Sequence, residues 1–333
     1  MFTHLFESFK KVNWIPSFGI LASTILLVSS LSGCKSESEL VVDDIPDSEN
    51  LLFTPEGRLF VSGGPNVFEV IKNDQGEFHK LDTFHDSCGV SGIIQRGDYI
   101  YGVCRKKNLD NSSTPYLIAG KIENLPESVS DATVDGDPHP AIEMKIIGAL
   151  SGLGNPNGME VDEFGNLYIA DFGTANIFKL HMVNPEEIGS IELWAPKIAF
   201  LVSGLEWVDD VLYFTGIRRG TTTAIMGKIE LNEEGGVGEV TELFERKYTV
   251  LDDLAAYKGG IIITDYFKGS LIFWKNGELQ AETMKDMFYA PSAVQPAQAP
   301  MFNQGALLVT EKGILYNSNK KYGNKLGLFY PDF

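Results

Sequence analysis

The sequence PNGMEVDEFGNLYIADFGTANIFKL, residues 156–180, forms one complete β unit and decides the fold. Residues 158–162 alternate apolar and polar side chains, residues 163–166 are typical of a turn, and residues 167–170 form an apolar strand. A short break, DFG, then precedes a third strand over residues 176–180. No helical spacing of apolar residues competes with this interpretation. We therefore predict short antiparallel strands joined by tight turns.

The same pattern, a polar residue and a small residue followed by strand, turn and strand, recurs along the chain. The other copies begin at Glu49, Ser91, Ser203, Asp252 and Pro291. The copies are spaced by roughly 45–50 residues, a period typical of propeller blades or solenoid turns. Three or four short strands and no helix per copy favour the propeller. We predict an all-β, six-bladed β-propeller over residues 49–333, with about four antiparallel strands per blade.

Composition narrows the possible partners. The chain has 333 residues and a formal net charge of −18, with acidic residues spread throughout. Nucleic acid binding requires clustered lysine and arginine, so we expect no nucleic acid partner. The simplest interpretation of the acidity is a solvated, charged surface.

The N-terminal segment is predicted to lie outside the propeller. Two lysines precede an apolar run over residues 15–31, which ends in the sequence LSGC at Cys34. This ending resembles the lipobox of bacterial lipoproteins. The resemblance implies a signal peptide over residues 1–33, cleavage before Cys34 and lipidation of its thiol, which would tether the protein to a membrane. The alternative is a single-pass anchor with an incidental cysteine.

The residues after the lipobox give the expected location and tether. Lys35 follows the cysteine, and by the sorting pattern of bacterial lipoproteins this favours the outer membrane within the cell envelope. Residues 34–48 are interpreted as the lipidated cysteine and a polar tether. Within it, residues 40–42 are a candidate for the outer strand that closes the ring, and residues 326–330 compete for that role.

Two cysteines remain once Cys34 is assigned to the lipid. They lie in an oxidising compartment, where pairing is favoured. Cys88 precedes the first strand of its repeat and Cys104 ends the second, so a hairpin that turns at residues 96–98 brings them together. We predict a Cys88–Cys104 disulfide.

The repeat also predicts a functional site. The innermost strands of a propeller run along the central axis in one direction, so residues at one repeat position form a ring at one mouth of the channel. The ring position holds Glu49, Ser91, Asn157, Ser203, Asp252 and Ser292. Every member offers an oxygen atom, and none offers sulfur or imidazole. We expect Ser91, Ser203 and Ser292 to line the channel beside the two carboxylates and the amide.

Oxygen donors of this kind suit a hard cation, which favours Ca²⁺ over Zn²⁺ or copper and leaves Mg²⁺ open. Two uncompensated carboxylates in a narrow channel are costly, so a cation between them is a physical expectation. The competing interpretation is that these polar residues belong to turns and strand caps.

The stretch PNGMEVDEFGNLYIAD resembles the repeat of the gluconolactonase/regucalcin (senescence-marker) family, the paraoxonases and the strictosidine-synthase-like propellers. The likeness is good over one blade. In those families a Glu, an Asn and an Asp bind a catalytic Ca²⁺, and the matching positions are Glu49, Asn157 and Asp252. Asp253 stands where a neighbouring residue assists in paraoxonase-like proteins.

This chain departs from the pattern at two ring positions. Ser91 replaces a histidine proposed as base in paraoxonase-like enzymes, and Ser203 replaces an asparagine ligand. The resemblance then implies a metal-dependent lactonase or esterase in which the metal polarises the carbonyl of a small-molecule substrate. Asp252 or Asp253 is the expected general base.

Two residues outside the ring are candidates for substrate contact. His85 precedes the second blade and is placed to overhang the mouth, and Arg218 is a cationic loop residue that an anionic substrate could meet. The competing interpretation for each is a polar residue of a solvated loop, which is the commoner role of such residues. Two other function classes stay open, a non-catalytic, lipid-tethered propeller that binds a protein or small ligand, and a purely structural envelope protein.

Overall fold

The computed structural model describes residues 38–73, 75–122, 133–134, 137–138, 142–313 and 323–333. The predicted signal segment, Cys34 and Lys35 lie outside the described residues, so their assignments stay predictions. Within the described ranges the chain contains no helix, and hence no helix long and apolar enough to cross a membrane.

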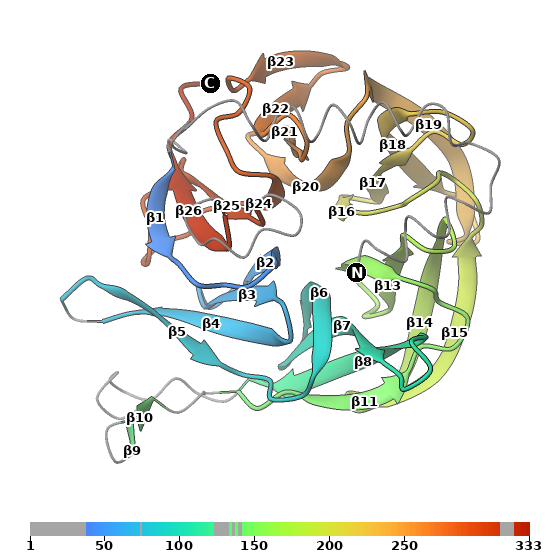
Figure 1. The fold of residues 1–333 in the computed structure, drawn as a ribbon. Helices are drawn as coiled ribbons and strands as arrows, with labels where there is room; N and C mark the ends of the chain where they lie inside the picture. The colour runs from blue at the N-terminus through green and yellow to red at the C-terminus, as the bar shows by residue number, and fades with distance from the viewer. Residues whose placement is uncertain (1–37, 74, 123–132, 135–136, 139–141, 314–322) are drawn as a thin grey trace. The chain divides into compact units, whose positions relative to one another are not determined.

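Six four-stranded antiparallel sheets surround a central axis, which confirms the predicted six-bladed β-propeller (Figure 1). Blade one contains β2 (Ser48–Phe53), β3 (Leu59–Gly63), β4 (Asn66–Lys72) and β5 (Phe78–Asp82). Blade two contains β6 (Cys88–Arg96), β7 (Tyr99–Lys107), β8 (Ser113–Lys121) and β11 (Lys145–Ala149). A two-strand ladder of β9 (Thr133–Val134) and β10 (Asp137–Pro138) lies in the connection between β8 and β11.

The next blades repeat the same up-and-down order. Blade three contains β12 (Pro156–Val161), β13 (Leu167–Asp171), β14 (Asn176–Asn184) and β15 (Glu187–Ala195). Blade four contains β16 (Leu205–Val208), β17 (Val211–Ile217), β18 (Thr223–Leu231) and β19 (Val237–Lys247). Blade five contains β20 (Leu251–Tyr257), β21 (Gly260–Asp265), β22 (Ser270–Lys275) and β23 (Glu278–Glu282).

Blade six joins the two ends of the propeller. It contains β24 (Pro291–Pro296), β25 (Leu307–Glu311), β26 (Lys325–Phe329) and, as its outer strand, β1 (Glu39–Val42). Both segments that competed for ring closure are therefore used, since β1 pairs antiparallel with β26. Part of the segment interpreted as a tether is thus a strand of the last blade.

The hydrophobic core lies between the blades. Each sheet has two faces, so alternate residues of a strand contact the blade before and the blade after. Between blades three and four, for example, Tyr168 meets Trp194 and Trp207 edge-to-face, with ring centroids 4.9 and 5.4 Å apart. This packing holds the inner strands at fixed positions around the axis, which is what positions a ring of side chains.

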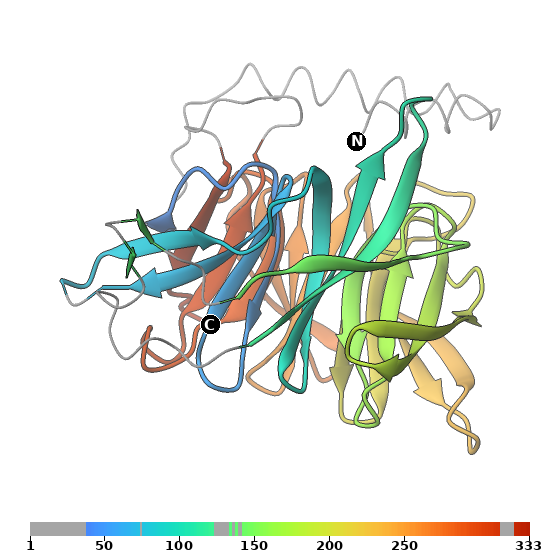
Figure 2. The same cartoon turned by 90° about the horizontal axis from the view of Figure 1, so that it is seen from below.

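The predicted disulfide is present. Cys88 on β6 and Cys104 on β7 are bonded, with their Cα atoms 5.5 Å apart. It joins the first two strands of blade two close to the mouth of the channel. The hairpin of β7 and β8, nine residues each, stands beyond the neighbouring blades on that side (Figure 2).

Candidate functional site

The ring residues occupy interruptions of the strand ladders. In five blades the pairing of first and second strand shifts register at the mouth of the channel. The shift in blade three falls between Pro156 and Met159, and Asn157 lies inside it. The shift in blade five falls between Leu251 and Leu254, and Asp252 lies inside it. Bulges of this kind re-aim side chains, and here they turn the ring residues toward the axis.

Glycine follows the ring residue in three blades because the next blade comes too close for a side chain. A Cβ on Gly92 would lie 2.1 Å from the carbonyl oxygen of Asn157, and one on Gly158 would lie 2.3 Å from that of Ser203. A Cβ on Gly204 would lie 2.8 Å from the Cα of Asp253. The small residue of the repeat is thus a packing requirement at the axis.

Hydroxyl groups on the second strands satisfy the amides freed by the bulges. Thr264 Oγ1 accepts a hydrogen bond from the Asp253 amide at 2.8 Å, and Thr215 Oγ1 accepts one from the Gly204 amide at 2.8 Å. Ser62 and Thr310 do the same in blades one and six. Thr215 also donates to the Asp252 carbonyl in the next blade at 2.9 Å, and Ser62 donates to the Ser91 carbonyl, so these two hydroxyls link neighbouring blades.

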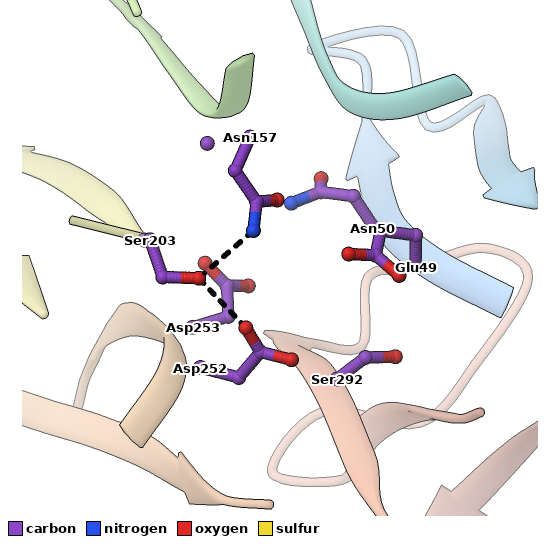
Figure 3. Close-up of a pocket in the computed structure, with 9 residues that line it drawn as sticks. Glu49, Asn50, Asn157, Ser203, Asp252, Asp253 and Ser292 are labelled. Atoms are coloured by element: carbon purple, nitrogen blue, oxygen red, sulfur yellow. Dashed lines mark hydrogen bonds between the residues drawn. The ribbon is translucent and has the colours of Figure 1, made fainter. Parts of the chain in front are cut away.

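Five of the six ring residues line one pocket at the mouth (Figure 3). Its lining comprises Glu49, Asn50, Asn157, Gly158, Ser203, Gly204, Asp252, Asp253 and Ser292. The space among these residues is about 180 Å³ and includes open solvent, so it leaves no room to bury a whole drug-sized ligand. It therefore suits an ion or a single functional group of a larger ligand.

The remaining ring residue, Ser91, is absent from the lining. Its hydroxyl donates to the Pro156 carbonyl at 2.9 Å and joins blade two to blade three. Ser292 does line the pocket, and its hydroxyl likewise donates to the next blade, at the Ser48 carbonyl, 2.7 Å away.

A hydrogen-bonded relay fixes the orientation of the central residues. Ser203 donates its hydroxyl proton to Asp252 Oδ1 at 2.7 Å, so it must accept from Asn157, whose Nδ2 lies 3.0 Å away. The amide nitrogen of Asn157 is thereby committed to Ser203, and its oxygen faces the side chain of Asn50 across the pocket (Figure 3). The relay leaves Asn157 Oδ1 and Asp252 Oδ2 as acceptors toward the pocket.

Burial perturbs the carboxylates of the site. Desolvation raises the pKa of Asp252 to about 6, against the lowering effect of the Ser203 hydroxyl. Burial also raises the pKa of Asp253 well above its ordinary value, and the charges of Asp252 and Glu206 add to this. Perturbed carboxyl groups in a cleft are typical of functional sites.

The acidic character continues along the channel. Burial raises the pKa of Glu206 on β16 to about 7, against a hydrogen bond that its Oε1 accepts from the Ala256 amide at 2.9 Å. Burial, and then the charge of Glu206, raise the pKa of Glu160 on β12 well above 4.5. Together with Asp252 and Asp253 on β20, these inner-strand carboxyl groups come from three neighbouring blades.

One lysine enters the pocket region. Lys312, which follows β25, makes an ion pair with Glu49 Oε2, and each side chain is only 9% exposed. Burial lowers the pKa of Lys312 to about 8, while the charge of Asp47 acts in the opposite direction. The carboxylate of Glu49 is thus already neutralised by the chain itself.

The donor set fits a hard divalent cation in its chemistry. The groups available are the carboxylates of Glu49 and Asp252 and the amide oxygen of Asn157, all oxygen atoms. Only two of them are charged, and no cluster of three or more His, Cys, Asp or Glu ligands occurs among the described residues. The Lys312–Glu49 ion pair is the one obstacle, because an ammonium and a metal ion repel each other. Calcium therefore stays a prediction.

The two residues predicted to contact substrate lie outside the pocket lining. Arg218 donates to Glu242 and Glu245 on the outer strand β19, at distances of 2.5–2.8 Å, and is exposed. His85 is exposed in the connection that leads to β6. Both stay untested as substrate contacts.

Sequence reasoning missed several residues of the site. Asn50 was overlooked because it stands where the repeat expects a small residue, and Lys312 was overlooked because its partner Glu49 is distant in the sequence. The supporting hydroxyls carried a detectable signal, since Ser62, Thr215 and Thr264 recur at the same place in second strands.

The fold and its mouth define a six-bladed β-propeller with an oxygen-lined pocket on the axis. The PQQ-bound aldose sugar dehydrogenase of Streptomyces coelicolor has a similar structure, with a TM-score of 0.60 and 13% identity over 89% of this chain and 97% of that chain. A gluconolactonase of Xanthomonas campestris gives a TM-score of 0.57 and 14% identity over 88% of each chain. A luciferin-regenerating enzyme gives 0.58 and 12%, over 89% and 93%.

These similarities, at 12–14% identity, show a shared fold. They confirm the predicted fold, which the gluconolactonase of Xanthomonas campestris also adopts. No protein-family model and no curated protein sequence matches the chain.

Proposed function

We propose that the protein is a cell-envelope hydrolase of lactones or related esters that uses a divalent cation, Ca²⁺, at the mouth of its propeller. The observation that carries the proposal is the convergence of Glu49, Asn157 and Asp252 on one small pocket beside a second buried carboxyl group, Asp253. The gluconolactonase from Xanthomonas campestris shares this fold and supports the substrate class.

The chain's own residues divide the chemistry. Glu49, Asn157 and Asp252 would hold the cation, which when bound would withdraw electrons from a substrate carbonyl. Ser203 orients both Asn157 and Asp252 through the relay. Asp252, and Asp253 beside it on β20, are the carboxyl groups of the pocket that could accept a proton from an attacking water.

Three buried polar atoms near the strand ends that carry the ring, outside the pocket lining, lack a partner in the part of the protein that the structure describes. Arg105 Nε at the end of β7, Asn155 Oδ1 before β12 and the Tyr266 hydroxyl after β21 are buried without a hydrogen-bond partner in the described part of the chain. Buried polar groups are normally satisfied, so an ordered water or a ligand group is expected at each of them. The ligand of the dehydrogenase, PQQ, fits less well, because its three carboxylates would meet the acidic ring.

The second candidate function is a non-catalytic, lipid-tethered propeller that binds a small ligand or a protein. Ser91 and Ser203 favour it, since they stand where catalytic histidine and ligand asparagine residues occur in the paraoxonases. A protein with this function would have the same bound cation and lipid anchor as the proposed hydrolase, but it would not hydrolyse a substrate.

A hydrolysis screen separates the two functions. We expect the full-length chain to hydrolyse a panel of γ- and δ-lactones and aryl esters with Ca²⁺ and to lose activity with a chelator. Asp252→Asn should lower the rate at least about 100-fold, because it removes the base and a cation ligand. Asp210→Asn, at a turn on the opposite end of blade four, is the matched control and should change nothing.

Ca²⁺-dependent thermal stabilisation without hydrolysis would favour the binding module, since a ligand at about 100 times its dissociation constant adds roughly 2.7 kcal/mol. Hydrolysis that survives Asp252→Asn would overturn the proposed site. A palmitate label on the wild type that disappears in Cys34→Ser would support the proposed lipid anchor and its membrane location.

A further inference from the structure

Lys312 is held at the mouth by its backbone. It follows β25 directly, and its amide donates to the Ala290 carbonyl at 3.1 Å. The next amide, of Gly313, donates to the Tyr289 carbonyl at 2.9 Å. Both acceptors lie in the segment that leads into β24, the inner strand of blade six. The side chain of Lys312 therefore starts from a fixed point beside the ring.

The side chain crosses from blade six to blade one. Its ammonium pairs with Glu49 Oε2, 263 residues away in sequence. Both side chains are only 9% exposed, unlike the surface pairs of this chain. A buried ion pair demands partners for both charges, because removing one leaves the other desolvated and alone. Glu49 is hence the anchor of Lys312, as well as a candidate ligand of a metal ion.

A divalent cation at the ring would compete with this ammonium. Glu49 shares the pocket with Asp252 and Asp253, so the pocket attracts positive charge. An ammonium and a divalent ion on the same carboxylate repel strongly at such distances, particularly in a poorly solvated channel. One carboxylate of this size cannot neutralise both.

We infer that Lys312 is a built-in competitor of the metal ion, so that a divalent cation binds the ring only when the Lys312 ammonium leaves Glu49. The inference rests on the proposed cation site and deepens it. In the absence of the ion, Lys312 neutralises Glu49 and keeps the ring intact. When the ion binds, the ammonium moves away from the carboxylate. The competition weakens cation binding by the wild-type ring.

The test is isothermal titration calorimetry of Ca²⁺ into the full-length chain and its variants. Lys312→Met removes the ammonium, and Lys312→Gln removes only the charge while keeping a hydrogen-bond donor for Glu49. We expect both to bind Ca²⁺ at least about tenfold more tightly than the wild type. The matched control is Lys325→Met, because Lys325 pairs with Glu311 at 3.3 Å in the same blade but outside the pocket.

Unchanged or weaker Ca²⁺ binding in the neutral Lys312 variants would overturn the inference, as would no binding by any variant. If Lys312→Met fails to fold, Lys312→Gln decides. Glu49→Gln should abolish the difference between wild type and variants. Binding by the variants alone would support the inference and show Lys312 as the resident cation of the wild-type ring. Calorimetry measures binding alone. A chain that shows this competition but hydrolyses no substrate would therefore support this inference and contradict the proposed hydrolase.

Discussion

The two halves of the ring are built differently. In blades two, three and four the ring residue is followed by a glycine, at Gly92, Gly158 and Gly204, and we call this half the glycine side. In blades five, six and one the following residue is Asp253, Ala293 or Asn50. This half, the charged side, also holds Asp252, Glu49 and Lys312.

The difference concerns the residue that follows the ring position. Packing determines it in one half of the ring, and the chemistry of the pocket determines it in the other. On the glycine side a neighbouring backbone comes within 2.1–2.8 Å of where a Cβ would lie, so a side chain is excluded. On the charged side the same repeat position carries Asp253 and Asn50, whose side chains reach the pocket (Figure 3). The glycine side therefore sets the spacing of the blades, and the charged side supplies the ionisable groups.

The largest effect should come from breaking the glycine side. Gly92→Ala places a methyl group 2.1 Å from the Asn157 carbonyl oxygen, so the backbone of β6 and that of β12 must move apart. We expect a loss of about 3 kcal/mol or more in the free energy of unfolding, at the upper end of overpacking effects. Urea unfolding followed by circular dichroism measures it.

Gly89→Ala is the matched control on the same strand, β6. Its Cβ would meet its nearest atom at 3.8 Å, an ordinary van der Waals contact. The variant should change the stability by less than about 1 kcal/mol. Equal losses for the two glycines would refute the packing explanation.

A pH experiment probes the boundary between the two halves. Glu206 belongs to blade four, and its carboxylate accepts a hydrogen bond from Ala256 in blade five. Its pKa is raised from 4.5 to about 7 by burial, so the folded state holds this proton more tightly than the unfolded state. The resulting stability is fully present below pH 4.5 and is lost as the pH rises through about 7.

Glu206→Gln keeps an acceptor for Ala256 and removes the titration. This group should lower the free energy of unfolding of the wild type by up to about 3 kcal/mol between acid and neutral pH. The variant should lack that part of the pH dependence. Unfolding free energies at several pH values between 4.5 and 8 test this. Parallel curves for the two proteins would contradict the assignment to Glu206.

The smallest effect concerns the relay that joins the halves. Ser203→Ala removes the donor to Asp252 and the acceptor of Asn157, and we expect a loss of about 1 kcal/mol. The pKa of Asp252 should rise above about 6, because the Ser203 hydroxyl lowers it. Carboxyl carbon-13 NMR titration measures the shift. Ser292→Ala, whose hydroxyl bonds to the Ser48 carbonyl, should leave the pKa of Asp252 unchanged.

The repeat predicted the fold because every blade needs the same short run of residues, and the chain contains that run six times. A polar residue, a small residue and two strands are needed in each blade, and Asn157-Gly158 shows why, since the bulge and the close backbone approach involve neighbouring residues. The disulfide between Cys88 and Cys104 followed from the same hairpin geometry and is confirmed.

The rest of the site depends on contacts between distant segments. Lys312 reaches Glu49 across the junction where the ring closes, and nothing near either residue in the sequence reveals the pairing. The same holds for β1 and β26, which both belong to blade six although the sequence presented them as alternatives. Local pattern determines the blades, whereas closure and charge pairing depend on the assembled ring.

The closing strand is also the first strand of the propeller in the chain. Glu39 of β1 pairs with Leu328 of β26, so the strand emerges 328 − 39 = 289 residues before its partner. Until β26 reaches it, β1 presents an unpaired edge. Glu39 and the acidic pair Asp43-Asp44 flank its apolar residues, and such charges discourage pairing with foreign strands. The acidic residues beside β1 are therefore placed to discourage foreign pairing until the ring closes.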